Sequence, residues 1–286
     1  MCVQKVLVAG ATGYLGRHLV SELKKQGFWV RALCRSTKQN DLVAAADDIF
    51  IGQVTEPSTL HGITAGIDVV ISAVGITRQK DGMTYMDVDY QGNANLLSEA
   101  ERTSVKKFIY ISAIDGDKNR HLKIFQAKER FVDLLKQSPI TSTIVRPNGY
   151  FSDMSDFLNM AATGRIYLFG NGNIQINPIS GGDLACCIVG LIADMPDEIT
   201  VGGPDVLSLN EISQLAAKAL GNQVKITYLP NWFRRSAITL TRLFTTQKVY
   251  GPIEFFLTFM GTSHIGQAVG SERLCDFYIK EAEKKK

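Results

Sequence analysis

Cysteine, histidine and net charge are all scarce in this chain of 286 residues. Its five cysteines form no Cys-x-x-Cys pair and show no ligand-like spacing with the four histidines, so we expect no metal site. The odd number of cysteines indicates free thiols in a reducing compartment, and we expect a cytoplasmic protein. A formal net charge of only +3, without a basic stripe that alternates with aromatic residues, argues against nucleic acid as a partner.

Long apolar runs and several catalytic motifs are also missing. No run is long enough to span a bilayer, and we expect no signal peptide because strand-like residues begin almost at Met1. The most aromatic stretch, residues 232–260, is interrupted by charged side chains. We expect it to cover a substrate pocket or, alternatively, to bind a partner or an interface. The lack of Gly-x-Ser-x-Gly, His-Glu-x-x-His and Gly-Lys-Ser/Thr motifs argues against the hydrolases and phosphate-transfer enzymes that use them.

A glycine-rich loop follows the first apolar run of the chain. Residues 6–9 read Val-Leu-Val-Ala, and an amphipathic pattern begins directly after the loop. Glycines in such a strand–loop–helix unit allow a tight turn, a close approach to a phosphate and close helix packing, while the helix N-terminus attracts the anion. The loop residues that we assign to dinucleotide binding are Gly10, Thr12, Gly13, Tyr14, Leu15 and Gly16.

Apolar runs alternate with helical patterns through the first half of the chain. Strands are expected at residues 6–9, 29–34, 48–51, 68–72, 108–112 and 142–145, and helices at 15–26, 87–102 and 122–137. This alternation predicts an α/β fold with a doubly wound, parallel Rossmann sheet in residues 1–150. After residue 150 the sequence becomes rich in turns, with helices expected at 182–192 and 210–220. We expect residues 151–286 to form a small α+β lobe against the carboxyl edge of the sheet, within one compact unit.

The end of the second expected strand favours NADP(H) over NAD(H). An NAD site usually has a carboxylate there for the ribose 2′-hydroxyl, but the first carboxylate after this strand is Asp41. Arg35 and Ser36 stand closer to the strand, and a guanidinium with small hydroxyls suits a 2′-phosphate. Arg31, inside the strand, is a weaker candidate for the same pocket.

Several motifs together resemble the atypical short-chain dehydrogenase/reductases, and especially the NmrA-like and divinyl chlorophyllide reductase-like groups. Besides the glycine loop, the matching segments are residues 72–75, 89–93, 111–113, 127–128, 146–151 and 178–185. The resemblance implies that Lys128 binds the nicotinamide ribose and that Ser112 polarises a substrate carbonyl. It also implies further contacts with the cofactor from Ala73, Val74, Gly75, Pro147, Asn148 and Gly149.

One position departs from the family pattern. The usual catalytic tyrosine stands four residues before the lysine, where a helix places both side chains on one face and the cation lowers the phenol pKa. Here that position is Ile124, so the relay for alcohol–ketone interconversion is absent. Tyr150, in the segment that the resemblance places beside the nicotinamide, is a candidate substitute proton donor, and His121 is a weaker one.

The sequence therefore favours an NADPH-dependent reductase that transfers hydride to a small molecule, with an activated carbon–carbon double bond as the expected acceptor. Water or another residue would then supply the proton. The alternative is a non-catalytic NADP(H)-binding sensor or assembly factor, which would use residues 232–260 to bind a protein partner. A sugar-nucleotide epimerase fits less well, because it needs the missing tyrosine.

Overall fold

The computed structural model describes residues 3–77, 82–221 and 223–284. Contacts between residues divide the chain into two compact units. The first comprises Met1–Arg146 and Leu184–Ile199, and the second comprises Pro147–Asp183 and Thr200–Lys286. Residues 184–199 therefore group with the first unit, although they lie inside the segment that the sequence assigned to the smaller lobe.

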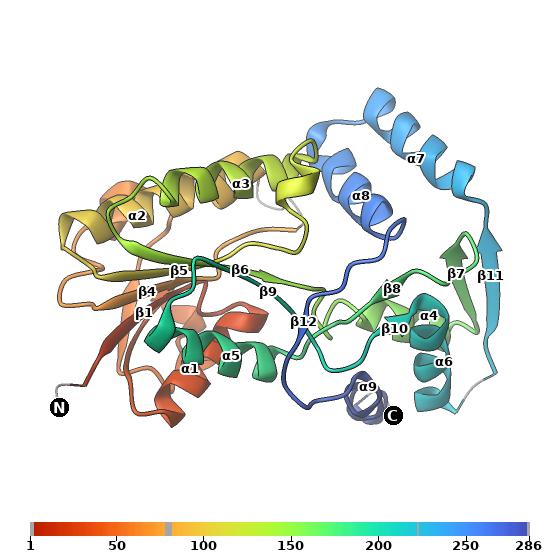
Figure 1. The fold of residues 1–286 in the computed structure, drawn as a ribbon, viewed down its shortest axis with the longest axis horizontal. Helices are drawn as coiled ribbons and strands as arrows, with labels where there is room; N and C mark the ends of the chain where they lie inside the picture. Colours follow the sequence, from red (N-terminus) through yellow and green to blue (C-terminus); the bar gives the residue numbers. More distant parts are fainter. Residues whose placement is uncertain (1–2, 78–81, 222, 285–286) are drawn as a thin grey trace. The chain divides into compact units, whose positions relative to one another are not determined.

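A parallel sheet of eight strands dominates the fold, in the order β12-β9-β6-β5-β4-β1-β2-β3 (Figure 1). Its strands are β1 (Lys5–Ala9), β2 (Trp29–Cys34), β3 (Asp48–Ile51), β4 (Val69–Ser72), β5 (Lys107–Ile111), β6 (Thr141–Pro147), β9 (Glu198–Gly202) and β12 (Gln267–Ala268). The direction of the order reverses between β1 and β4, and ligands of open α/β sheets bind beyond the carboxyl ends of strands at such a point. The predicted fold class is confirmed.

Helices cover both faces of the sheet in the first unit: α2 and α3 lie on one side, and α1 and α5 on the other (Figure 1). The helices are α1 (Tyr14–Lys25), α2 (Asn93–Arg102), α3 (Lys123–Leu135) and α5 (Gly181–Asp194), with short η1 (Thr37–Val43), η2 (Pro57–Leu60), η3 (Met86–Gly92) and η4 (Asp117–Asn119). Strands covered on both faces need continuous apolar sequence, and Val6, Leu7 and Val8 are fully buried. The apolar stripe of α1 is likewise buried at Leu15 and Leu19.

The second unit has its own core. Around it lie α4 (Ser155–Ala162), α6 (Leu209–Leu220) and α9 (Leu274–Glu283), together with the parallel pair β7 (Arg165–Phe169) and β11 (Lys225–Leu229). Phe151, Leu158 and Tyr278 are among its buried side chains. The unit also contains the antiparallel pair β8 (Gln175–Ile176) and β10 (Leu207–Ser208), and the helices α7 (Asn231–Phe244) and α8 (Gln247–Phe259).

The segments expected in the first half correspond to observed elements with small shifts in their ends. The main difference is the helix expected at residues 87–102, which consists of a π-helical turn, η3, followed by α2. None of the helices in the part of the chain that the structure describes is long and apolar enough to cross a membrane.

Candidate functional site

The glycine loop lies at the carboxyl end of β1, next to the ends of β2 and β4. The register pairs Val8 with Ala32 of β2 and Ala9 with Ser72 of β4. Gly10 has a φ of +78°, which lets the chain leave the strand, and Gly13 N–H then donates to the Gly10 carbonyl at 3.0 Å. Helix α1 begins directly after this turn.

Gly10 and Gly16 allow close backbone packing. A Cβ atom on Gly10 would lie 2.8 Å from the Ala73 carbonyl oxygen, and one on Gly16 would lie 2.1 Å from the Gly10 carbonyl oxygen. Both contacts are with backbone, so a side chain at either position would displace the loop. These two glycines therefore have a structural reason to be glycine.

The constraint on Gly13 within the protein is milder. It is exposed and precedes α1 with φ −72° and ψ 173°, an extended conformation that other residues adopt, and no side chain caps the helix. An added Cβ would meet only the Gly10 carbonyl oxygen, at 3.2 Å. The open space lies beside a helix N-terminus, where backbone N–H groups bind anions. This cradle, which a side chain would fill, fits the pyrophosphate of a dinucleotide.

The other loop residues flank this cradle. Thr12 and Tyr14 are half-buried, and the Tyr14 ring packs edge-on against His18 at 5.2 Å between centroids. Leu15 is buried and anchors the first turn of α1. The loop thus offers backbone and a small hydroxyl, rather than charged side chains, to a phosphate.

Arg35 and Ser36 follow β2 at the same edge of the sheet. The Arg35 side chain is exposed, and the backbone N–H of this residue donates to Gln39 Oε1 at 3.1 Å. Ser36 directly precedes η1. Arg31 has a different role, because its Nε donates to Asp48 at 2.6 Å and its Nη1 to the Ile63 carbonyl at 2.8 Å. Arg35 is therefore the better placed of the two arginines for a 2′-phosphate.

The end of β4 is fixed by a residue that the sequence reading left without a role. Asn93, the first residue of α2, accepts a hydrogen bond from Ser72 Oγ at 2.5 Å and donates to the Asp89 carbonyl at 2.9 Å. Ala73 N–H donates to the Ala9 carbonyl at 3.0 Å, which joins this segment to the glycine loop. The predicted residues Ala73 and Val74 therefore lie directly beside Gly10, and Gly75 follows them in the chain.

Lys128 reaches the same segment from α3 and forms a buried ion pair with Asp89. Its Nζ lies 2.8 Å from Asp89 Oδ1, and a Cβ on Gly75 would come within 2.7 Å of both atoms. Burial raises the pKa of Asp89, while Lys128 and the N–H of Ile76 oppose the rise. Asp89 lies four residues before Asn93, and that spacing is the sequence signal for a shared helix face.

No tyrosine accompanies Lys128 on α3. Ile124, one turn earlier, is buried with 5% of its surface exposed. Tyr110 of β5 is nearer, since Lys128 Nζ lies 5.8 Å from its ring centroid, but it is fully buried and burial raises the pKa of its hydroxyl. A protonated hydroxyl in the core does not meet a substrate.

Ser112 belongs to a second buried network. Its Oγ donates to Glu129 Oε1 at 3.0 Å, and Arg146 binds the same carboxylate through two nitrogens, at 2.6 and 2.9 Å. Arg146 Nε also donates to Glu198 at 2.5 Å. Burial opposes the charge of Arg146, but the two carboxylates outweigh burial and raise its pKa. The Ser112 hydroxyl is thus held by a charged pair, and its action on a substrate carbonyl stays a prediction.

Four further predicted residues lie in the second unit. Asn148 is buried and donates to Asn177 Oδ1 at 2.8 Å and to the His264 carbonyl at 2.7 Å, so it fixes the loop after Pro147. Gly149 N–H donates to Asn148 Oδ1 at 2.8 Å. Tyr150 is half-buried, and its N–H donates to Asp153 Oδ2 at 3.0 Å. The remaining predicted residues belong to the first unit.

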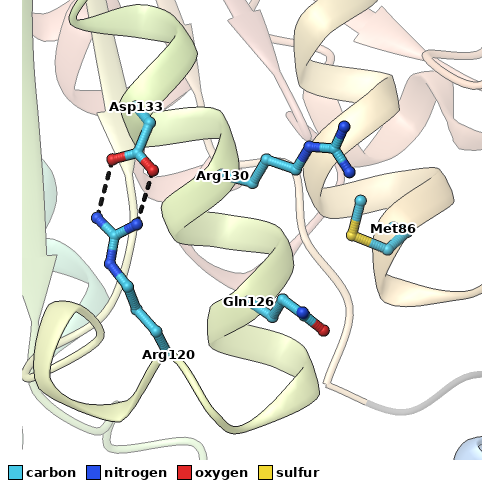
Figure 2. Close-up of a pocket in the computed structure, with 5 residues that line it drawn as sticks. All are labelled: Met86, Arg120, Gln126, Arg130 and Asp133. Carbon is cyan, nitrogen blue, oxygen red and sulfur yellow. Dashed lines mark hydrogen bonds and ion pairs between the residues drawn. The ribbon is translucent and has the colours of Figure 1, made fainter.

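An open depression of about 450 Å³ lies elsewhere, on the outer face of α3 (Figure 2). Its lining residues are Met86, Arg120, Gln126, Arg130 and Asp133. Arg120 binds both oxygens of Asp133, at 2.6 and 2.8 Å (Figure 2). None of the predicted site residues is among the five that line this depression.

A family model described as NAD(P)H-binding matches residues 10–194 of the chain. The chain belongs to the NAD(P)H-binding family. The glycine loop and the ends of β2 and β4 described above lie at the start of the matched region. Among the residues that the structure describes, no group of three His, Cys, Asp or Glu is placed to hold a metal ion.

Two kinds of curated relative are similar to this family member. Divinyl chlorophyllide a 8-vinyl-reductase, chloroplastic, of Arabidopsis thaliana is 30% identical over 250 residues, which cover 79% of this chain and 60% of the relative. Photosystem II assembly factor Ycf39 of Synechocystis sp. is 26% identical over 245 residues, which cover 84% of this chain and 75% of that protein. The chain thus spans only about 60% of the length of the vinyl-reductase. The resemblance to the NmrA-like and divinyl chlorophyllide reductase-like groups is confirmed.

Solved structures share the fold at low sequence identity. The NADPH-dependent quinone oxidoreductase QOR2 of Escherichia coli, complexed with NADPH, has a TM-score of 0.72 and 16% identity over 96% of this chain and 99% of that one. AtPrR2 with NADP+ and (+)pinoresinol has a TM-score of 0.77 and 15% identity over 98% and 99% of the two chains. At these identities the likeness shows the fold alone.

Proposed function

We propose that the protein is an NADPH-dependent reductase that adds hydride to an activated carbon–carbon double bond of a small molecule. The observation that carries the proposal is the environment of Lys128. Its ammonium is paired with buried Asp89 beside Gly75, and Ile124 replaces the usual tyrosine one turn earlier. The site therefore keeps a cation for the nicotinamide ribose and lacks the hydroxyl that alcohol–ketone chemistry needs.

Each residue of the site has its own proposed role. A bound nicotinamide dinucleotide supplies the hydride. The glycine loop holds the pyrophosphate, Arg35 and Ser36 bind the 2′-phosphate, and Lys128 orients the ribose. Asp89 keeps the Lys128 ammonium at the end of β4, 2.8 Å from its carboxylate. Tyr150 is the candidate that delivers a proton to the carbon next to the one that receives the hydride, where negative charge develops, and Pro147, Asn148 and Gly149 shape the loop that carries this tyrosine.

The substrate class is proposed from two supports. The absent tyrosine disfavours ketones and alcohols, because Ile124 stands where the family pattern has the hydroxyl that donates the proton. The similarity to a vinyl-reductase supports conjugated alkenes, including vinyl groups on tetrapyrroles. NADP(H) is proposed over NAD(H) because Arg35, rather than a carboxylate, follows β2.

A second candidate function is an NADP(H)-binding assembly factor that binds a protein partner and does not turn over a substrate. The similarity to an assembly factor and the exposed aromatic residues of α7 favour this alternative. Its cofactor site would be the same, so cofactor binding alone does not separate the two functions. A cytoplasmic location stays part of the proposal for either function.

Two measurements test the proposal on the purified chain. Calorimetric titration should give a lower Kd for NADPH than for NADH. Oxidation of NADPH should then proceed with an enone, a quinone or a divinyl tetrapyrrole, and Tyr150→Phe should lower kcat with little change in KM. Tight NADPH binding without turnover on this panel, together with a partner captured by the NADPH-bound chain, would favour the assembly factor instead.

A further inference from the structure

Helix α7 exposes an unusual set of apolar side chains. No residue of this helix is buried. Five large apolar side chains are between 49% and 79% exposed, namely Trp232, Phe233, Leu240, Leu243 and Phe244. At 100° per residue they occupy an arc of about 120° around the helix. We call this largely apolar arc, in which the exposed Ser236 also lies, the α7 face.

The α7 face points away from the neighbouring helix of the second unit. Contacts with α8 come from other positions of α7: Arg234 Nη1 donates to the Leu257 carbonyl at 2.7 Å, and Arg242 pairs with buried Glu254. These contacts fix α7 along α8, which follows it in the chain after Thr246 (Figure 1). The apolar face is therefore presented by a helix that is already held on its other side.

All the charged side chains from the start of α7 to the residue before Glu254 are positive. Residues 231–253 contain four cations, Arg234, Arg235, Arg242 and Lys248, and no carboxylate. Arg235 and Lys248 are exposed. On the helical projection Arg235 lies beside one edge of the apolar arc, and Arg242, on the same side, is the arginine that pairs with Glu254. This distribution suits a negatively charged surface rather than a second copy of the same segment, because two copies would bring like charges together.

We propose that the α7 face binds the surface of an anionic lipid bilayer, with α7 lying in the plane of the membrane. Helices of this kind place Trp, Phe and Leu at the boundary between headgroups and acyl chains, and their Lys and Arg side chains meet anionic headgroups. The proposal does not depend on the catalytic function, because it concerns a surface that contains no dinucleotide-binding residue.

Vesicle flotation with the full chain tests this proposal. We expect the protein to float with vesicles of phosphatidylcholine and phosphatidylglycerol, and much less with phosphatidylcholine alone. The double variant Leu243→Ser/Phe244→Ser should bind the mixed vesicles at least about tenfold more weakly, because it removes two of the apolar side chains that enter the bilayer. Ile279→Ser is the matched control, since Ile279 is 49% exposed on α9.

The charge contribution has its own pair of variants. Arg235→Glu should weaken binding to the mixed vesicles, whereas Lys218→Glu, which makes the same charge change on the exposed side of α6, should have a smaller effect. In a Trp29→Phe background, emission from Trp232 should move to shorter wavelength when mixed vesicles are added. Circular dichroism of each variant separates lost binding from lost folding.

Three results would overturn the proposal. The first is the absence of binding to either kind of vesicle. The second is vesicle binding that the α7 variants leave unchanged, which would place the membrane contact elsewhere. The third is a dimer in sedimentation analysis that Leu243→Ser/Phe244→Ser dissociates, because the α7 face would then be covered by a second copy of the chain.

Discussion

Replacing Gly13 by valine separates the folding of the glycine loop from its binding of a dinucleotide. The backbone at Gly13 is extended, and an added Cβ would meet only one atom of the protein, the Gly10 carbonyl oxygen at 3.2 Å. That contact is tight and requires the loop backbone to shift by a few tenths of an ångström, so we expect the variant to fold with a modest loss of stability. It should nevertheless place methyl groups in the open space beside the N-terminus of α1.

The expected loss of stability is smaller than the expected loss of NADPH affinity. Replacing glycine by valine at the position before a helix should lower the free energy of unfolding by about 0.5–1 kcal/mol. Methyl groups in the cradle would keep the pyrophosphate from the backbone N–H groups, and we expect NADPH affinity to fall at least about 100-fold, or roughly 2.8 kcal/mol. The effect on binding should thus exceed the effect on stability several-fold.

Gly16→Ala is the control with the opposite expectation. Its Cβ would lie 2.1 Å from the Gly10 carbonyl oxygen and 2.7 Å from Ala11 Cα, so the backbone of the loop has to move. We expect this smaller substitution to lower the free energy of unfolding by about 3 kcal/mol. Calorimetric titration with NADPH and urea unfolding, applied to both variants, give the comparison.

Two outcomes would refute this reasoning. If Gly13→Val binds NADPH as the wild-type protein does, the space beside α1 is not the pyrophosphate site. If Gly13→Val destabilises the protein as much as Gly16→Ala does, the loop does not tolerate a side chain at Gly13 and the binding result loses its meaning.

Three other substitutions test the charged groups of the first unit. Arg35→Ala should weaken NADPH binding by about 10–100-fold and NADH binding little, because a guanidinium–phosphate contact is lost; equal losses in titrations would contradict the 2′-phosphate assignment. Glu129→Gln should lower the free energy of unfolding by about 3 kcal/mol, since it leaves Arg146, 3% exposed, without its bidentate carboxylate; an unchanged urea midpoint would contradict this. Arg102 lowers the pKa of Glu99 below its ordinary value of 4.5, so this pair stabilises the fold above that pH and loses its effect as the pH falls through the folded pKa. Glu99→Gln should therefore reduce the acid-induced loss of stability, measured as unfolding free energy against pH.

The sequence predicts most strands of the central sheet, because these strands are made mainly of apolar residues. Residues 29–34 and 48–51 were expected as strands and are β2 and β3 with the same ends. The glycine loop is also predictable, since its residues act through the local backbone and lie next to one another. Arg31 shows the limit, because its partners Asp48 and Ile63 come from later segments that the β2 sequence does not reveal.

The π-helical turn η3 was not predictable from periodicity. Residues 87–102 show one helical pattern, yet residues 86–92 form a wider turn before α2 begins at Asn93. Such turns occur often at functional sites. Here the turn carries Asp89, which is fully buried and pairs with Lys128. The partner of the predicted lysine thus depends on a local distortion that the sequence pattern conceals.

Ser112 illustrates a different limit. Its partners Glu129 and Arg146 lie 17 and 34 residues away, on α3 and β6, and the sheet order alone brings them together. A serine at the end of a strand matches the family motif whether it faces a substrate or a buried carboxylate. The motif therefore predicts the position of Ser112, whereas its hydrogen bonds with Glu129 and Arg146 come from the fold.

The pairing of Lys128 with Asp89 bears directly on the missing tyrosine. In a tyrosine–lysine pair, the free cation lowers the phenol pKa, and the phenol then donates its proton to the substrate. Here the Lys128 charge is largely balanced by a carboxylate 2.8 Å away, so its effect on a neighbouring hydroxyl is weakened. A tyrosine restored at position 124 would also have to replace a buried isoleucine. The site around Lys128 is thus built to hold a cation in place beside Gly75, which suits a ribose-binding role and leaves proton delivery to a group outside α3.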